Sequence, residues 1–585
     1  MCHYVPISMI VGNKLLINKD NMMSNNQPVI AALAAVLTDL STEQIVEKLE
    51  APKSSELGDV AFPTFTLAKT LHKAPQQIAN DIVAKIDQNG FEKVVATGPY
   101  VNFFLDKYAT SNQTIKTIID LKGAYGDNTN GNGANVTIDM SSPNIAKPMS
   151  MGHLRSTVIG NALANITKKN GFNPVKINHL GDWGTQFGKL IYAYKTWGSE
   201  AEVKADPIAT LLRYYVEFHE KAKEDDSLND QGRAWFKKLE DGDEEAHQLW
   251  QWFRAESLKE FTQIYDRLDI EFDSFNGEAF YNDKMDKVVD ILTDKEILIK
   301  SQGAQIVDLS AINPNLTPAM IKRSDGATLY MTRDLAAAIY RKETYNFAKS
   351  LYVVGGEQRE HFVQMKAVLS LMGFDWADDV EHIAFGLITF NGKKMSTRKG
   401  DVVLLKDVLD DAHELALKQI KEKNPELQNK PLVAEQVGAG AVVFHDLMND
   451  RTNNFDFNLE EVVRFEGDTG PYVQYTNARA KSILRKANTE IDPTTLNLND
   501  DSTWDIVTTL NNFPQTVERA WQQREASVIA KYALTLSRAF NKYYANSKIL
   551  TVDDQLNARL ALVQAVSIVL TESLRLLGVK APEEM

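Results

Sequence analysis

Residues 141–157 read SSPNIAKPMSMGHLRST, and this stretch joins a predicted strand to a predicted helix. Before it, residues 136–140 alternate apolar and polar side chains, as a strand does. After it, apolar residues recur at helical spacing until cations and Gly171 end the helix. Residues 174–180 form a second predicted strand, which completes a βαβ unit. Such units open a ligand crevice at the carboxyl ends of their strands, so the sequence predicts a nucleotide site here.

The turn in this stretch contains residue types that bind phosphate. Gly152 lets a phosphate approach the start of the helix, where backbone N–H groups lack helical partners. Lys147 and His153 supply further donors. The glycine-rich dinucleotide fingerprint and the P-loop are absent from the sequence, so we expect a different nucleotide-binding arrangement. The alternative is an ordinary strand-to-helix turn with a solvated His and Lys.

A second segment, KKMSTRKG at 393–400, follows a predicted strand at 385–390 and the tight-turn signal Asn391-Gly392. Its four cations and two hydroxyls suit a mobile clamp on a polyphosphate. A solvated basic loop is the alternative.

Together the two segments resemble the signature motifs of the class I aminoacyl-tRNA synthetases. SMGH at 150–153 stands at the place of the HIGH motif, and KMSTR at 394–398 stands at the place of KMSKS. Longer blocks narrow the resemblance to the arginyl-tRNA synthetases: SSPNIAKP at 141–148, HLGDWGTQFG at 179–188, YMTRD at 330–334, GDTGPYVQY at 467–475 and LLG at 576–578. The resemblance runs from about residue 28 to Met585. Ser150 replaces the first His of the first motif, and Thr397 replaces the second Lys of the other.

The resemblance implies an α/β multidomain fold, whose class I Rossmann-like catalytic domain has a parallel sheet and spans residues 134–455. A charged, tryptophan-rich segment at about 195–300 is a predicted helical insertion. The pattern predicts an N-terminal α+β domain at 28–125 and a C-terminal all-α bundle at 456–585. The resemblance implies that the first binds tRNA and that the second binds the anticodon. Residues 1–27 show no sustained periodicity, so we expect a disordered extension that can be removed up to Met22 without harm.

The implied function is that of an arginine-tRNA ligase, with ATP, L-arginine and tRNA(Arg) as substrates and Mg²⁺ accompanying ATP. Formation of arginyl-adenylate requires positioning and charge neutralisation more than a strong base. The expected catalytic residues are Lys147, His153, Lys394, Ser396 and Arg398. The expected ATP-binding residues are Ser150, Gly152, His153, His361 and Lys394.

Recognition of arginine should depend on carboxylates, because a planar guanidinium pairs best with them. Asp334 follows Tyr330 by four residues, which places both on one face of a helix. The resemblance places five residues around the substrate arginine: Asp139, Asn144, Tyr330, Asp334 and Gln358. For Asp334, the alternative is a carboxylate that stabilises the N-terminus of its own helix.

Contacts with tRNA are implied in both terminal domains. The expected residues are Asn102, Phe103, Tyr472, Tyr475, Tyr543 and Met585. For Phe103 and the adjacent Phe104, a position in the core is the alternative.

Composition sets outer limits on function. A net charge of −14 argues against indiscriminate polyanion binding but allows local basic surfaces. The single cysteine, Cys2, excludes a disulfide framework and a cysteine zinc site, and no metal site is predicted. The sequence has neither an apolar run of membrane-spanning length nor the pattern of a secretory signal, so we expect a cytoplasmic protein without a membrane partner. We also expect a monomer.

Two other functions remain open at this point. One is an adenylate-forming enzyme of the same superfamily that activates a different amino acid. The other is a catalytically silent tRNA-binding or regulatory paralogue, for which Ser150 and Thr397 are the only support.

Overall fold

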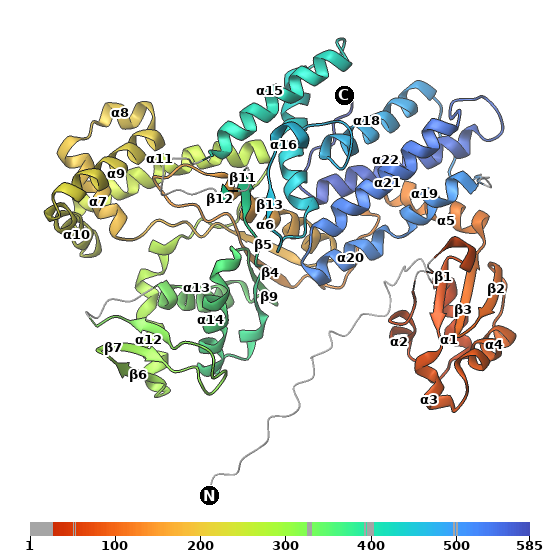
Figure 1. Cartoon of the computed structure of the whole chain (residues 1–585), viewed down its shortest axis with the longest axis horizontal. Helices are drawn as coiled ribbons and strands as arrows, with labels where there is room; N and C mark the ends of the chain where they lie inside the picture. Colours follow the sequence, from red (N-terminus) through yellow and green to blue (C-terminus); the bar gives the residue numbers. More distant parts are fainter. Residues whose placement is uncertain are drawn as a thin grey trace, which may run out of the picture. The chain divides into compact units, whose positions relative to one another are not determined.

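The computed structural model describes residues 27–50, 52, 54–324, 330–390, 393–394, 403–494, 496, 498 and 501–585 (Figure 1). The extension predicted at the N-terminus therefore lies outside the described residues, apart from Gln27, as do Ser396, Thr397 and Arg398 of the second signature segment. The described chain divides into two compact units. The first unit contains residues 27–105, 127–133 and 170–172, and the second contains the remainder.

The first unit is a small antiparallel sheet covered by helices. The strand order is β1-β3-β2, with bounds β1 Val60–Pro63, β2 Phe91–Thr97 and β3 Tyr100–Leu105. Its helices are α1 Gln27–Val36, α2 Thr42–Val46, α3 Ala68–Leu71 and α4 Pro75–Lys85, with single turns at η1 Ser55–Leu57 and η2 Phe65–Leu67. Pro75 opens α4, where its fixed φ suits a first helical turn. This confirms the predicted α+β character of the N-terminal region.

The second unit contains a four-stranded parallel sheet with the order β10-β9-β4-β5. The strands are β4 Asn135–Asp139, β5 Asn173–Ile177, β9 Lys349–Tyr352 and β10 Val380–His382. The helices that follow or precede them are α6 Met151–Lys169, α13 Tyr330–Tyr345 and α14 Arg359–Leu371, with single turns at η5 Gly356–Gln358 and η6 Asp375–Asp379. The predicted βαβ unit is therefore confirmed. Its second strand ends at Ile177, earlier than expected, because the N–H of Asn178 donates to the carbonyl of Ser274 at 2.8 Å.

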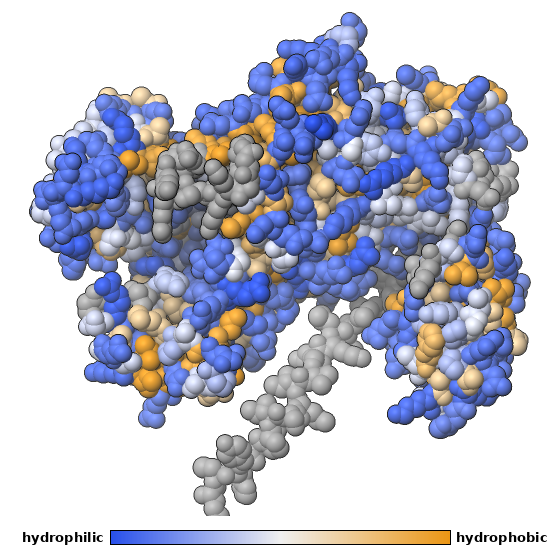
Figure 2. All heavy atoms as spheres, viewed as in Figure 1, coloured by the Kyte–Doolittle hydropathy of each residue, from blue (hydrophilic) through white to orange (hydrophobic). Residues whose placement is uncertain are grey.

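Helices fill most of the segment between β5 and α13. They are α7 Thr185–Trp197, α8 Glu200–Ala205, α9 Pro207–Glu224, α10 Ser227–Glu240, α11 Glu244–Leu268, η4 Glu278–Lys284 and α12 Met285–Asp294. A small antiparallel sheet follows, formed by β6 Leu298–Ser301, β7 Ala304–Val307 and β8 Ala319–Lys322. The visible face of α8–α10 is mostly hydrophilic, in keeping with its many charged residues (Figure 2).

A short hairpin carries the second signature segment. β11 Ile388–Phe390 pairs antiparallel with β12 Lys393–Lys394 and parallel with β13 Phe455–Asp456. The strand predicted at 385–390 is thus shorter than expected. Residues 385 and 386 instead bond to other loops, through Gly356 N–H to Phe385 O and Gly386 N–H to Arg451 O.

The C-terminal part is a helical bundle, as predicted. Beyond residue 456 its helices are α17 Leu459–Val462, α18 Gly470–Ala487, α19 Asp501–Asn511, α20 Phe513–Gln523, α21 Ser527–Asn546 and α22 Leu556–Leu576. Two further helices, α15 Leu405–Lys423 and α16 Lys430–Met448, precede them within the predicted catalytic domain. α5 Lys107–Leu121 and the single turn η3 Lys122–Ala124 belong to this second unit, where α5 packs against α19 and α22. No helix in the described ranges has the length and apolar character needed to span a bilayer.

Candidate functional site

The turn after β4 holds three non-glycine residues in the left-handed region of backbone space. They are Ser141 at φ 72°, Ser142 at φ 51° and Ala146 at φ 60°. Their N–H groups donate to side-chain oxygens from other elements: Ser141 to Ser156 at 2.9 Å, Ser142 to Asn178 at 3.2 Å and Ala146 to Ser257 at 3.0 Å. Surrounding contacts thus maintain a strained turn, and strain of this kind is concentrated at binding and catalytic sites.

His153 lies in the first turn of α6, and its orientation is fixed by Ser150. Its Nδ1 is 3.0 Å from the backbone N of Ser150 and 3.1 Å from the Ser150 hydroxyl. Because a backbone N–H can only donate, Nδ1 accepts and the proton of the neutral ring lies on Nε2. Burial lowers the pKa of His153, and the nearby charge of Lys147 lowers it further. His153 is therefore a neutral donor, and Ser150 performs an orienting role.

Lys147 is held against the helical insertion. Its ammonium lies 5.2 Å from the centre of the Tyr215 ring on α9, a cation–π geometry. Burial lowers the pKa of Lys147. Since its charge also acts on His153, both predicted phosphate donors lie at the same end of the sheet.

Backbone hydrogen bonds join the first signature motif to residues 403–405, which follow the second signature segment. Met151 N–H donates to Val403 O at 3.1 Å, and Leu405 N–H donates to Met149 O at 2.9 Å. Lys394 lies in β12, at the other boundary of the same segment. Residues 403–405, which follow this segment, are therefore held beside the start of α6, whereas Lys394 pairs with Thr389 of β11.

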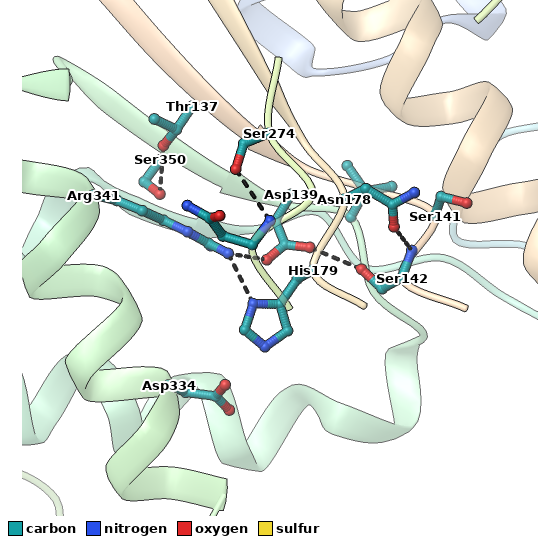
Figure 3. Close-up of polar contacts among 12 residues, drawn as sticks. Thr137, Asp139, Ser141, Ser142, Asn178, His179, Ser274, Asp334, Arg341 and Ser350 are labelled. Atoms are coloured by element: carbon teal, nitrogen blue, oxygen red, sulfur yellow. Dashed lines mark hydrogen bonds and ion pairs between the residues drawn. The ribbon is translucent and has the colours of Figure 1, made fainter. Parts of the chain in front are cut away.

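Asp139, expected to bind the substrate, already has partners within the chain. One carboxylate oxygen accepts from Arg341 Nη2 at 2.7 Å, and the other accepts from the Ser142 hydroxyl at 3.0 Å (Figure 3). Both Asp139 and Arg341 are buried. A buried carboxylate that neutralises an internal guanidinium is poorly suited to bind a second one directly, and contact between Asp139 and the substrate arginine stays a prediction.

His179 and Arg341 were not expected in the site. The His179 Nδ1 lies 3.2 Å from Arg341 Nη2 and accepts its hydrogen bond (Figure 3). The imidazole also stacks on Tyr281, with the ring centres 5.4 Å apart. Burial lowers the pKa of His179, although the charge of Asp139 opposes this shift. The motif at 179–188 contained a signal for His179. No sequence signal indicated Arg341, because an arginine within a helix is more often a solvated cation.

Asp334 and Tyr330 lie one helical turn apart on α13, and both contact His361 of α14. The Asp334 carboxylate accepts from His361 Nε2 at 2.7 Å, and the Tyr330 ring centre lies 4.8 Å from the imidazole centre. His361 is buried, and within the described chain its Nδ1 has no hydrogen-bond partner. A residue expected on the nucleotide side and two expected on the arginine side thus form one cluster.

Glu278, the first residue of η4, is a further acidic group of this cluster that sequence reasoning missed. Burial raises its pKa to about 7, the charge of Arg333 opposes that shift, and the charge of Asp334 reinforces it. One Glu278 oxygen lies 4.0 Å from Arg333 Nη1. Arg333 is the residue directly before Asp334 in α13, so its contact with Glu278 brings η4 close to the start of α13. Glu278 is 56 residues before Asp334 in the chain, so no local spacing could have indicated the pair.

Asn144 and Gln358 lie in loops that follow strands of the parallel sheet. Asn144 forms a parallel bridge with Gly181, where an added Cβ would lie 2.3 Å from the Asn144 side-chain oxygen. Gly181 therefore leaves room for this side chain. Gln358 is exposed in η5, which follows β9.

In the N-terminal unit, the structure corrects one predicted tRNA contact. The Phe103 side chain is fully buried and packs on Phe91 at 5.3 Å, so it cannot reach a tRNA. Phe104 points away from that core, where Lys93 lies 4.1 Å from its ring centre. Asn102 is also largely buried.

In the bundle, too, the predicted aromatic residue is buried and its neighbour in the sequence is exposed. Tyr543 is only 3% exposed, whereas the adjacent Tyr544 is 42% exposed. The Arg479 guanidinium lies 4.9 Å from the ring centre of Tyr475 and 4.8 Å from that of Tyr544. Tyr472 accepts from Asn541 at 3.0 Å through its hydroxyl. This aromatic and cationic surface suits stacking of unpaired bases.

The remaining expected features concern the C-terminus and metal ions. Met585 is half-buried, and its carbonyl accepts from Asn424 at 3.1 Å. Among the described residues, no group of three or more His, Cys, Asp or Glu side chains could hold a metal ion.

Comparison with known proteins gives matches along the length of the chain. Three family models match: the arginyl tRNA synthetase N terminal domain at 27–105, the tRNA synthetases class I (R) catalytic domain at 114–459, and the DALR anticodon binding domain at 473–585. An arginine-tRNA ligase of Leuconostoc mesenteroides is 85% identical over 563 residues, covering 96% of this chain and 100% of that protein. That of Latilactobacillus sakei is 65% identical over 565 residues, covering 96% and 100%. The solved Thermus thermophilus arginyl-tRNA synthetase has a TM-score of 0.80 and 25% identity, covering 95% of this chain and 99% of that one.

Proposed function

The chain belongs to the arginyl-tRNA synthetase family and is an arginine-tRNA ligase, and from that premise we propose how its residues divide the work. It uses ATP to convert L-arginine to arginyl-adenylate, and it then transfers the arginyl group to tRNA. The alternative of a silent paralogue has no support in these similarities.

The substrate guanidinium binds between Asp334 and Glu278, beside Tyr330. The observation that carries this assignment is a pair of partly exposed carboxyl groups on adjoining elements: the Asp334 side chain is 27% exposed, and the Glu278 side chain, 30% exposed, lies 4.0 Å from the guanidinium of the neighbouring Arg333. A guanidinium offers five N–H donors in a plane, enough to pair with both carboxylates. Asn144 and Gln358 are assigned to the amino and carboxylate end of the substrate, and His361 fixes the Asp334 carboxylate.

The phosphates of ATP bind at the N-terminus of α6. His153 donates through Nε2–H, and Lys147 contributes a positive charge. The free backbone N–H groups around Gly152 donate at the positive end of the helix dipole. The second segment adds Lys394, Ser396 and Arg398. An arginine carboxylate oxygen attacks the α-phosphorus as the bond to pyrophosphate breaks, and these donors neutralise the charge that develops.

The transfer step needs a tRNA held by both terminal parts of the chain. In the N-terminal unit we assign Phe104, in place of the buried Phe103. We leave out Asn102, which is only 4% exposed. In the bundle we assign Tyr472, Tyr475, Met585 and Tyr544, the last in place of the buried Tyr543. Mg²⁺ enters with ATP, and the protein acts as a cytoplasmic monomer.

Amino-acid-dependent pyrophosphate exchange with tRNA(Arg) tests the substrate assignment. We expect exchange with arginine and rejection of lysine by about 10⁴-fold, because a site built for a planar donor set leaves its acceptors unpaired with an ammonium. Equal exchange with lysine, or no exchange with any amino acid, would contradict the proposal.

A further inference from the structure

Arg451 joins two distant parts of the second unit. It lies between α16 and β13, and its guanidinium donates to Ala384 O at 2.7 Å through Nη1 and to Arg524 O at 3.0 Å through Nε. Its own carbonyl accepts from Gly386 N–H at 2.8 Å. Ala384 and Gly386 lead directly into β11, and Arg524 caps the end of α20. The Arg451 side chain, 19% exposed, thus joins the α20–α21 turn to residues 384–387, which we call the approach to β11.

β11 is the first strand of the hairpin that carries the second signature segment. Arg155 fixes the same approach from the other side, since its Nη1 donates to Gly386 O at 2.9 Å and to Asn453 O at 3.0 Å. Arg155 lies two residues after His153 on α6, and it is buried beside Asp446. The base of the hairpin is therefore held between α6, which presents the first signature motif, and Arg451.

The bundle docks on the same loop through the beginning of α21. The Ser527 hydroxyl donates to the Asp450 carboxylate at 3.0 Å, and the Lys531 ammonium lies 2.6 Å from it. Arg451 N–H also donates to the Glu525 carboxylate at 3.3 Å. Farther along α21 is Tyr544, part of the proposed tRNA surface. The α20–α21 turn thus lies between that surface and Arg451.

We propose that Arg451 is a positioning residue that connects the tRNA-binding bundle to the ATP-binding hairpin. When tRNA fixes α21, the Arg524 carbonyl and the Arg451 guanidinium hold residues 384–387, which lead into β11, in the arrangement required for use of ATP. The planar fork of arginine fits this task, because it donates to two carbonyls in fixed directions, which a lysine ammonium does not. The inference rests on the proposed function, because it assumes that the second segment binds ATP.

The test compares Arg451→Ala and Arg451→Lys with a matched control, Arg559→Ala. Arg559 is 14% exposed and also donates to backbone carbonyls, Ile549 O at 2.9 Å and Thr551 O, but those carbonyls belong to a loop within the bundle. For each full-length protein, arginine-dependent pyrophosphate exchange is measured against tRNA concentration. The dissociation constant for tRNA and the melting temperature are measured alongside.

Arg451→Ala is expected to lower the maximal exchange at saturating tRNA by about 2- to 30-fold, the range found for residues that modulate coupling between sites. Its dissociation constant for tRNA should change by less than about twofold, because Arg451 touches none of the proposed tRNA contacts. Arg451→Lys should fall between wild type and Arg451→Ala. Arg559→Ala should lose stability and keep its maximal exchange.

Three results would overturn the inference: full exchange by Arg451→Ala, a loss explained by weaker tRNA binding, or an equal loss in Arg559→Ala. If Arg451→Ala fails to fold, Arg451→Lys decides, and full exchange in it would reject the need for the arginine fork. Absence of exchange in the wild type would reject the proposed function instead, so the two failures are distinguishable.

Discussion

Asp334 is the residue whose replacement best separates recognition of arginine from stability. Asp334→Asn keeps the shape but removes the charge that faces the substrate cation. Loss of one partner of a buried charged pair costs about 2–5 kcal/mol, or roughly 30- to 5000-fold in kcat/KM for arginine. The KM for ATP should barely change, because the phosphate donors lie on α6 and in the second segment. Kinetics for both substrates and a melting curve check this.

The contrary result for Asp334→Asn is a folded variant with normal arginine kinetics. In that case the carboxylate would serve only His361 and its own helix, and the melting temperature alone would fall.

Glu278 predicts a pH dependence of arginine binding. Burial raises its pKa from 4.5 to about 7, so the free protein loses this negative charge as the pH falls below 7. The substrate cation binds the ionised form, so the KM for arginine should fall as the pH rises from 6 to 8. Below the pKa of Glu278, the KM for arginine can change by at most about tenfold per pH unit. Glu278→Gln should bind arginine weakly with a flat profile, whereas a profile that keeps the wild-type slope would remove Glu278 from the site.

At the level of elements, α6 is positioned by its close approach to β4. A Cβ added at Gly160 would lie 2.4 Å from the Cβ of Met140, directly after the strand. Gly160 is therefore a packing residue in a helix whose first turn holds Gly152 and His153. Displacement of α6 would move the phosphate donors.

Gly160→Ala tests this packing. Alanine favours a helix by up to about 1 kcal/mol over glycine, but overpacking against Met140 costs about 1–3 kcal/mol. We expect a lower melting temperature and a raised KM for ATP. Gly123→Ala is the control, because its nearest contact would be 3.9 Å away, from Glu572. A Gly160→Ala protein as stable and active as wild type would show that the contact relaxes without effect.

At the level of the whole molecule, activation of arginine is expected to depend on tRNA. Arginyl-tRNA synthetases usually need bound tRNA to activate arginine. The hydrogen bonds of Arg451 to Arg524 O and Ala384 O connect the bundle to the approach to β11, and they give a physical route for such induced fit. Pyrophosphate exchange with arginine and ATP alone should be near background and should rise when tRNA is added. Brisk exchange without tRNA would reject this dependence, while the assignment of the arginine site would stand.

The sequence by itself determined the local order of the fold. Alternation at 136–140 and helical periodicity after Leu154 specify the βαβ unit, because the repeats of strands and helices differ. The four-residue spacing of Tyr330 and Asp334 placed both on one face of α13, and long motifs identified the family.

Only the tertiary structure decided which charged side chains pair with one another and which aromatic side chains are buried. Arg341 neutralises Asp139 from 202 residues away, and Glu278 joins Asp334 from another segment, which no local pattern encodes. Adjacent aromatics such as Phe103 and Phe104 are alike in sequence, and only the packing of neighbouring elements buries the first and leaves the second partly exposed. Burial and charge pairing depend on contacts between distant segments, and the fold creates those contacts.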